Sequence, residues 1–350
     1  MKAAVYVGEG RVSVQTLETP TIGPGEILVR VESCGICHTD LKKIEYNLLE
    51  PPRIYGHETA GVVAAVGKNV TRHAAGDRVI VFHHIPCGNC FYCQRRLYAQ
   101  CPRYKKVGVT AGYEPAGGGF AQYVRVMNWI VERGVERIPN GISFDQACWV
   151  EPVNTILKGV ELLKLQPGEV VAVLGQGPIG LIFTMLAKRI GARVFATDTI
   201  AFRRNLSGEF GAAAFDPRDA GFATAIRSAT DGRGADAVVL ATSVHGLVEQ
   251  ALQMSRPGAR ILLFAQTSAK ERIEMAGADI CVGERTLFGS YSADVDLQSE
   301  SARLVFDREL PLERLISHRL SLTEIQSGIE IAMHPSAESL KVVVHPQELN

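Results

Sequence analysis

Between residues 169 and 292, six short apolar runs alternate with segments of helical character, and this alternation restricts the possible folds more than any other feature. The runs include EVVAVLG, RVFATD, ADAVVLAT and ARILLFA, and segments such as PIGLIFTMLAKRIG and LVEQALQMSRPG separate them. Neighbouring parallel strands need a crossover connection, which is usually a helix. The alternation therefore predicts an α/β domain with a doubly wound parallel sheet.

The first 130 residues have a different pattern. They contain short β-rich runs, AAVYVG, VSVQTLE, ILVRVESCGI, AGVVAAVG and RVIVFH, separated by turn clusters such as TIGPGE and GKNV. This pattern predicts an all-β domain, either a barrel or a sandwich. Helical periodicity begins after Ser143, a predicted N-cap, and we place the start of the second domain near that point. One or two helices follow residue 296, and SLKVVVH predicts a last strand.

Three glycines mark the start of the α/β domain. In VVAVLGQGPIGLIF, Gly175, Gly177 and Gly180 follow an apolar strand and open a helix, with Pro178 and Ile179 between the last two. The first glycine permits a tight turn, the second lets a pyrophosphate approach the backbone, and the third allows helix and strand to pack closely. Because a helix N-terminus attracts phosphate, this loop predicts a dinucleotide site.

An acidic residue closes the next strand. Asp198 lies eighteen residues beyond Gly180, where a carboxylate would accept hydrogen bonds from both hydroxyls of an adenosine ribose. A carboxylate would repel the 2′-phosphate of NADP, so the pattern favours NAD. NADP stays open as an alternative, because Arg203 and Arg204 could reach a 2′-phosphate.

Half of the eight cysteines lie in one short loop, PCGNCFYCQRRLYAQC. A disulfide, a redox or nucleophilic thiol and a metal site are the competing explanations, and no export signal is visible, so disulfides are disfavoured. Two-residue gaps let successive thiolates surround one ion, and a closed shell of four sulfurs suits structural zinc, with an iron centre as the lesser alternative. The predicted ligands are Cys87, Cys90, Cys93 and Cys101.

Composition restricts the possible partners. Lysine plus arginine and aspartate plus glutamate each total 37, so the formal net charge is zero. Without a basic run, nucleic acid or an anionic membrane is disfavoured as the main partner, and no apolar stretch approaches a bilayer span. We expect a cytoplasmic protein that acts on a small molecule.

A second group of metal-ligating residues is dispersed in the sequence. Cys37 lies in CGICHTD after a strand, His57 and Glu58 adjoin in YGHETAG, and Glu151 lies where the two domains are expected to join. A thiolate, an imidazole and carboxylates form a mixed shell that can leave one position open for water or substrate. Catalytic zinc requires such an open position.

Taken together, these motifs resemble those of the zinc-dependent medium-chain dehydrogenases, closest to the sorbitol (polyol) and threonine dehydrogenase branch. The resemblance covers nearly the whole chain and rests on CGICHTD, GHE, the four-cysteine loop, GGGFAQY, the EP turn and the glycine fingerprint. It implies a GroES-like catalytic domain over residues 1–153 with a structural zinc lobe at about 86–102. It also implies a Rossmann NAD-binding domain over residues 154–292, followed by a segment, 293–350, that returns to the catalytic domain. The resemblance further implies a homodimer or homotetramer.

The resemblance also implies residue roles. Cys37, His57 and Glu58 match the catalytic metal ligands, with Glu151 binding directly or through water, and Asp40 matches an acid that orients the ligand histidine.

Further matches concern the cofactor and the substrate proton. His38 and Thr155 match positions that contact the cofactor, and Thr39 matches the hydroxyl that takes the substrate proton. Many relatives end a proton relay with a histidine five residues after the ligand cysteine, but Lys42 occupies that position here, so the relay is expected to differ.

The sequence thus predicts a zinc-dependent oxidoreductase that transfers a hydride between a polyol or secondary alcohol and NAD, giving a ketone or aldehyde. A threonine 3-dehydrogenase-type enzyme or a specialised carbonyl reductase on the same scaffold is the alternative. A non-catalytic NAD-binding protein is the alternative from another class, because fold alone does not determine function.

Overall fold

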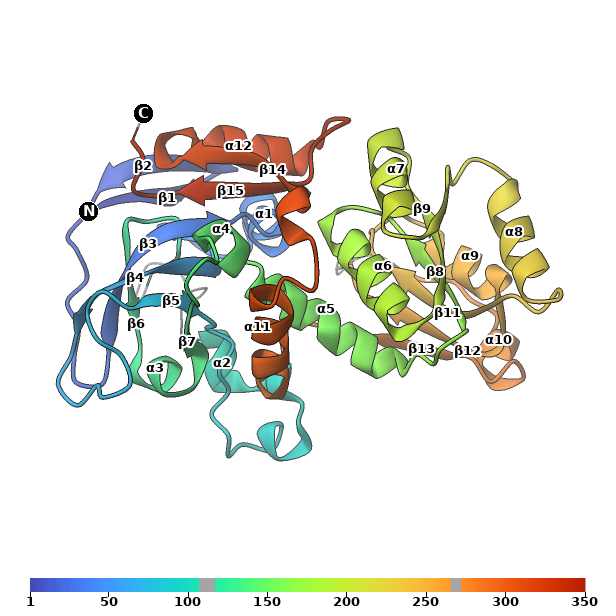
Figure 1. Ribbon diagram of the computed structural model, residues 1–350, viewed down its shortest axis with the longest axis horizontal. Coiled ribbons are helices and arrows are strands. Elements are labelled where there is room, and N and C mark those ends of the chain that lie inside the picture. The colour runs from blue at the N-terminus through green and yellow to red at the C-terminus, as the bar shows by residue number, and fades with distance from the viewer. Residues whose placement is uncertain (107–116, 266–271, 350) are drawn as a thin grey trace. The chain divides into compact units, whose positions relative to one another are not determined.

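The computed structural model describes residues 1–106, 117–265 and 272–349. The chain divides into two compact units (Figure 1). The first unit comprises Met1–Asn154 and Ser292–Asn350, and the second comprises Thr155–Tyr291.

The second unit contains a six-stranded parallel sheet in the order β10-β9-β8-β11-β12-β13. Sequence order reverses at β8, which is the arrangement of a doubly wound fold, so the predicted fold class is confirmed. Its strands are β8 Val170–Leu174, β9 Arg193–Thr197, β10 Ala213–Phe215, β11 Ala235–Leu240, β12 Ser255–Leu263 and β13 Thr286–Gly289. The helices between them are α6 Pro178–Ile190, α7 Ala201–Glu209, α8 Gly221–Ala229, α9 Leu247–Met254 and α10 Gly277–Cys281.

The central strand β8 explains why this sheet needs helices on both faces. All five of its residues, VVAVL, are buried, so it shows no alternation of apolar and polar positions. A strand that is buried on both faces reads as a continuous apolar run. Side chains from α8 and α9, including Ile226 and Leu252, pack with β8 and β11 into one core cluster.

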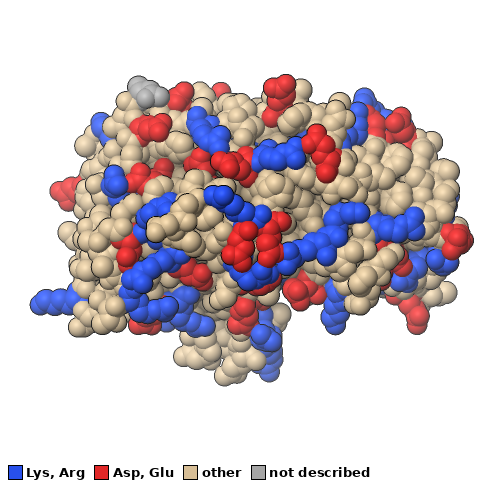
Figure 2. All heavy atoms as spheres, in the orientation of Figure 1, with Lys and Arg blue, Asp and Glu red and all other residues tan. Residues whose placement is uncertain are grey.

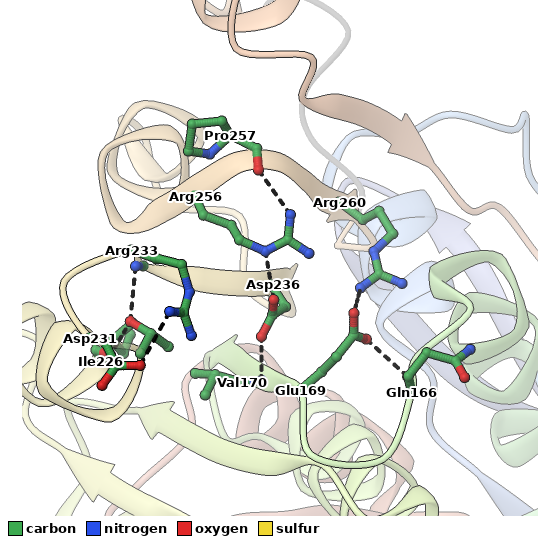
Figure 3. Close-up of polar contacts among 12 residues, drawn as sticks. Gln166, Glu169, Val170, Ile226, Asp231, Arg233, Asp236, Arg256, Pro257 and Arg260 are labelled. Carbon is green, nitrogen blue, oxygen red and sulfur yellow. Dashed lines mark hydrogen bonds and ion pairs between the residues drawn. The ribbon is translucent and has the colours of Figure 1, made fainter.

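Polar side chains fasten the beginnings of these strands. Asp236 accepts hydrogen bonds from the backbone amide of Val170 at 2.7 Å and from Arg256 Nε at 2.6 Å (Figure 3). Beside it, Glu169 pairs with Arg260. These contacts link β8, β11 and β12 near the N-terminal ends of the strands, whereas the glycine loop follows the C-terminal end of β8.

Strand β12 begins earlier than the sequence predicts. The segment Ser255–Gly258 was expected to end the preceding helix, but it belongs to β12. The ladder with β11 shifts between Ala235 and Ala237, so Pro257 lies in an irregular stretch. A proline without an N–H group is tolerated there, because no ladder hydrogen bond is required of it.

The first unit is rich in β-structure, as predicted. Its main sheet has the order β14-β15-β3-β4-β5-β7, with β6 paired to β3, and β1 and β2 form a separate pair. The strands are β1 Lys2–Gly8, β2 Arg11–Thr16, β3 Ile27–Gly35, β4 Glu58–Val66, β5 Arg78–Val81, β6 Tyr123–Val126, β7 Val135–Arg137, β14 Ile316–Ser321 and β15 Lys341–His345. Its helices include α1 His38–Glu45, α2 Pro102–Lys106, α3 Asn128–Gly134, α4 Phe144–Ala147, α11 Gln298–Phe306 and α12 Ile325–Met333.

Strand β3 lies between β4 and β15 (Figure 1). Gly35 at its end pairs with Glu58 of β4 and with Val343 of β15. Residues that are far apart in the sequence therefore meet where β3 ends.

The predicted N-cap at Ser143 is confirmed. Ser143 accepts a hydrogen bond from the amide of Gln146 at 3.1 Å, and the Gln146 side chain accepts one from the amide of Ser143 at 3.1 Å. This capping box starts α4. A second helix, α5 Val150–Leu163, follows at once and carries the chain from the first unit into the second.

Among the described residues on the face drawn in Figure 2, acidic and basic side chains are interspersed rather than gathered by sign. Over the described residues, no helix combines the length and the apolar character needed to cross a bilayer.

The contact between Asp145 and His345 predicts a pH-dependent part of the stability. Asp145 accepts hydrogen bonds from Ser33 Oγ at 2.7 Å, Arg319 Nε at 2.6 Å and His345 Nε2 at 2.9 Å. The hydrogen bond to Asp145 raises the pKa of His345, although burial opposes the shift. Its stabilising contribution is therefore complete below the ordinary histidine pKa of about 6.5 and is lost as pH rises through the raised value.

We expect His345→Asn to lower the free energy of unfolding by about 1 kcal/mol at pH 6, and by clearly less at pH 9. Urea denaturation at both pH values measures the difference. His334→Asn, at an exposed histidine, is the matched control. An equal loss at both pH values would contradict the ion-pair explanation.

Candidate functional site

The four predicted cysteine ligands lie together. The sulfur atoms of Cys87, Cys90, Cys93 and Cys101 are all within 4.8 Å of one another. Cys93 Sγ is 3.8 Å from Cys87 Sγ and 3.4 Å from Cys90 Sγ. Zn–S bonds of about 2.3 Å in a tetrahedron place the sulfurs about 3.8 Å apart, so the cluster fits a zinc ion.

The backbone of this lobe supports thiolate formation. Hydrogen bonding to the backbone at Asn89 lowers the pKa of Cys87 to about 6, although partial burial opposes the shift. The amide of Cys87 also donates to Cys101 Sγ at 3.4 Å. Two single-turn helices, η1 Cys93–Arg95 and η2 Tyr98–Gln100, shape the loop, so short local structure rather than a large core holds the sulfurs.

A second cluster of possible metal ligands lies where β3 ends. Cys37 is the N-cap of α1, just past β3, while Glu58 is the first residue of β4 and His57 precedes it. Because Gly35 pairs with Glu58, the two segments are adjacent. The ligand atoms of Cys37, His57 and Glu58 lie within 4.8 Å of one another, and both His57 and Glu58 are buried.

Asp40 fixes the orientation of the histidine in this cluster. Its carboxylate, fully buried, lies 3.1 Å from His57 Nδ1. Burial disfavours the charged imidazole, but Asp40 and Cys37 outweigh this effect and raise the pKa of His57 well above its ordinary value. The contact with Asp40 engages Nδ1 and leaves Nε2 for a metal ion, which is a common arrangement around ligand histidines.

Glu151 lies close to this cluster but is not among the three residues whose ligand atoms meet. Its carboxylate is 3.4 Å from His84 Nδ1. Burial raises the pKa of Glu151 to about 7, with a further contribution from Glu58 and an opposing one from His57. Its role as a direct or water-mediated ligand stays a prediction.

Two neighbouring histidines close to this cluster are absent from the residues predicted from the sequence. His83 and His84 directly follow Phe82 after β5, and both are buried. The His83 ring centroid is 5.5 Å from that of His57 and 3.7 Å from that of His84. A pair of histidines at the end of an apolar strand, RVIVFHH, was the only local signal that could have indicated them.

Lys341 is the third residue absent from that prediction. It begins β15, is buried, and forms an ion pair with Glu58. Its Nζ also donates a hydrogen bond to the carbonyl oxygen of Ile36 at 3.0 Å, across 305 residues of sequence. No local motif could have revealed this contact, because it depends on how β15 pairs with β3.

The remaining residues predicted to act on the substrate proton or the cofactor belong to helices α1 and α5. His38 is the first residue of α1 and is exposed, and Thr39 follows it, partly exposed. Lys42 lies one turn further along α1, and Thr155 belongs to α5. Their proposed roles remain predictions.

The glycine loop has the backbone geometry that its sequence predicts. Gly175 has φ +94°, a conformation that favours glycine. A Cβ atom at Gly180 would lie 1.8 Å from the carbonyl oxygen of Gly175, so only glycine fits. Gly177 is the N-cap of α6, with Pro178 and Ile179 in its first turn, so the helix N-terminus opens directly from the loop.

Asp198 lies beside this loop and is fixed by the backbone. Its carboxylate accepts hydrogen bonds from the amides of Gln176 at 2.7 Å and Ile200 at 2.8 Å. Arg203 Nη1 is 4.0 Å from Asp198 Oδ2. Burial lowers the pKa of Arg203, and the charge of Asp198 opposes that shift.

Comparison with known proteins defines the class. Residues 23–135 match the alcohol dehydrogenase GroES-like domain, and residues 178–307 match the zinc-binding dehydrogenase family. A D-altritol 5-dehydrogenase of Agrobacterium fabrum is 32% identical over 93% of this chain and 94% of its own length. The chain therefore belongs to the zinc-dependent medium-chain dehydrogenases of the alcohol dehydrogenase superfamily, which confirms the resemblance.

Other relatives carry different names within this family. A sorbitol dehydrogenase of Bacillus subtilis is 29% identical over 99% of this chain and 97% of its own length. An L-threonine 3-dehydrogenase of Symbiobacterium thermophilum is 31% identical over 95% of this chain and 94% of its own length. A structure of a zinc-binding dehydrogenase from Sinorhizobium meliloti 1021, bound to NADP, has a TM-score of 0.87, 31% identity and 99% coverage of both chains.

The sulfur cluster predicts a metal-dependent stability. We expect Cys93→Ser to lose one zinc ion per chain and to lower the melting temperature by about 5 °C or more, because a structural zinc stabilises the fold that binds it. Metal analysis and thermal melting measure both effects. Cys281→Ser, at an exposed cysteine outside the cluster, serves as the control. A Cys93→Ser protein with its full metal content and unchanged melting would refute the assignment.

Proposed function

We propose that this chain is an NAD-dependent, zinc-dependent dehydrogenase that converts a polyol or secondary alcohol into a ketone or aldehyde. The observation that carries the proposal is the meeting of Cys37, His57 and Glu58, with Asp40 behind the histidine. A thiolate, an imidazole and a carboxylate form a shell that can leave a coordination position open, as catalytic zinc needs.

The residues divide the chemical work. Cys37, His57 and a carboxylate, Glu58 or Glu151, would hold the zinc ion. As a Lewis acid, the bound ion would lower the pKa of the substrate hydroxyl. Asp40 holds His57 Nδ1, so the ring keeps one orientation. Thr39 would take the proton of the substrate hydroxyl and pass it outward, and the hydride on the alcohol carbon would go to the nicotinamide of NAD, so that a carbonyl product and NADH are formed.

The second unit provides the cofactor site in this proposal. The amides at the start of α6 and the glycine loop bind the pyrophosphate of NAD, and Asp198 binds the adenosine ribose. His38 and Thr155 contact the cofactor. NAD is favoured over NADP because the Asp198 carboxylate would repel a 2′-phosphate, although Arg203 beside it keeps NADP as the alternative.

Polar surroundings support a polyol rather than a simple alcohol. His83, His84 and Glu151 are buried polar side chains close to the candidate metal ligands. Buried polar groups favour ligands that can form hydrogen bonds with them. The sorbitol and altritol dehydrogenases among the relatives agree with this choice, and the threonine dehydrogenase keeps an amino alcohol as the second candidate.

A non-catalytic NAD-binding protein fits less well, because such a protein needs neither the ligand cluster nor Thr39. We also propose a homodimeric or homotetrameric, cytoplasmic enzyme, with the domain functions divided as the sequence predicts.

The activity is tested by following the appearance of NADH with sorbitol, altritol, simple secondary alcohols and L-threonine. We expect turnover with polyols that disappears on chelation, and at least about a thousandfold loss of kcat in Cys37→Ser, since the metal shell loses its thiolate. NADH binding, measured by fluorescence, should stay within about twofold as the control. A Cys37→Ser enzyme with full turnover would refute the zinc assignment.

Cofactor choice is tested at Asp198. We expect Asp198→Ala to reduce the ratio of kcat/KM for NAD to kcat/KM for NADP by about tenfold or more, because the ribose loses its acceptor and the 2′-phosphate loses a repulsive charge. Asp219→Ala, at an exposed aspartate in the same unit, is the matched control. An unchanged ratio would count against the role of Asp198.

A further inference from the structure

A lysine occupies the interior beside the second ligand cluster. Lys341 is 7% exposed, and its ammonium group pairs with Glu58, one of the three candidate ligands. Lysine is rarely buried without a partner of opposite charge, because removing an ammonium ion from water is costly. The pair therefore places a fixed positive charge beside a site that is built for a metal cation.

The surroundings of Lys341 are specific to this side chain. Nζ donates a hydrogen bond to the carbonyl oxygen of Ile36 at 3.0 Å and lies 5.3 Å from the ring centroid of Trp149. A Cβ atom at Gly35 would lie 1.9 Å from Glu58 Oε2 and 2.7 Å from Lys341 Cε, so the pair needs glycine at that position. A carbonyl, an aromatic face and a glycine thus accommodate the ammonium group.

The charge of Lys341 is supported by its neighbours. Burial disfavours the ammonium form, but Glu58 and Cys37 outweigh that effect and raise the pKa of Lys341. The ion pair with Glu58 and the hydrogen bond to the carbonyl oxygen of Ile36 both suit the ammonium form of Lys341. Two cations, the ammonium group and the metal ion, then share one buried carboxylate.

We propose that Lys341 is the resident counter-ion of Glu58 and competes with the metal ion for this carboxylate, so that it limits how tightly the centre binds its metal. This inference rests on the proposed metal centre of Cys37, His57 and Glu58. Without the metal, Lys341 neutralises Glu58 and keeps the site folded. With the metal, the positive charge of Lys341 opposes binding of the second cation.

The competition has a measurable consequence. Replacing Lys341 by an uncharged residue leaves Glu58 as an unpaired buried charge, which destabilises the metal-free protein. The metal-bound protein suffers less, because the metal ion neutralises the same carboxylate. By linkage, the variant must then bind metal more tightly, and its stability must depend more strongly on metal.

The test uses Co²⁺ as the probe, added to the full chain after chelation has emptied this site while the four-cysteine site keeps its zinc. The thiolate-to-cobalt absorption reports binding, and Cys37→Ser identifies the signal that belongs to this centre. The variants are Lys341→Met, Glu58→Gln and the double variant. Lys68→Met removes an exposed lysine and controls for a general change of charge.

We expect Lys341→Met to bind Co²⁺ about tenfold or more tightly than the wild type, and Lys68→Met to stay within about twofold. In the Glu58→Gln background, Lys341→Met should raise the Co²⁺ affinity by a clearly smaller factor, because the shared carboxylate is gone and only the repulsion between the two cations remains. Thermal melting should show a larger gain on adding Co²⁺ for Lys341→Met than for the wild type.

The outcomes distinguish a failure of the competition by Lys341 from a failure of the metal centre itself. Equal or weaker Co²⁺ binding by Lys341→Met would overturn the competition, and so would an equal effect of Lys341→Met in both backgrounds. Absence of a thiolate-to-cobalt signal from the wild type would instead overturn the metal centre. A Lys341→Met chain that folds only with Co²⁺ would support the competition, and Lys341→Gln carries the same test if Lys341→Met does not fold at all.

Discussion

The antiparallel pairing of β3 with β4 and β15 is the constraint on which the candidate centre depends. Gly35 pairs with Glu58 on one side and with Val343 on the other. That register puts the segment of Cys37 beside His57 and Glu58, and it brings Lys341 to the same place. A shift of one residue would turn these side chains to the opposite face, so the sheet rather than the loops determines which groups meet.

Electrostatics explains why this arrangement is stable despite its buried charges. Asp40 lies against His57, Glu58 pairs with Lys341, and Glu151 lies against His84. Each buried carboxylate thus has a partner that can carry positive charge, which offsets much of the cost of removing it from water. Two of these carboxylates differ in their acidity. Although burial opposes the shift, the contact with His57 lowers the pKa of Asp40, whereas burial raises the pKa of Glu151 to about 7.

The sequence predicts most of the fold and part of the site, and the division follows the range of each signal. The apolar strands and the glycine loop depend on residues that are close together in the sequence, and the four sulfur ligands lie within one short segment. These features can therefore be recognised from the sequence. Lys341 carries no local pattern, and the histidine pair after RVIVF is only a weak one, because the role of these residues depends on pairing between distant strands. The early start of β12 was missed for a related reason, since Pro257 is tolerated only where the ladder is irregular.

The position of β15 within its sheet has a consequence for the order in which the protein assembles. This strand lies between β14 and β3, yet it follows the entire second unit in the sequence. During synthesis, β3 and β4 leave the ribosome long before β15 does, and the second unit has time to fold in between. The carboxylate of Glu58 can therefore pair with Lys341 only after the ribosome has translated the whole second unit. On the proposal that Lys341 competes with a metal ion for Glu58, this competition begins only once β15 has been synthesised.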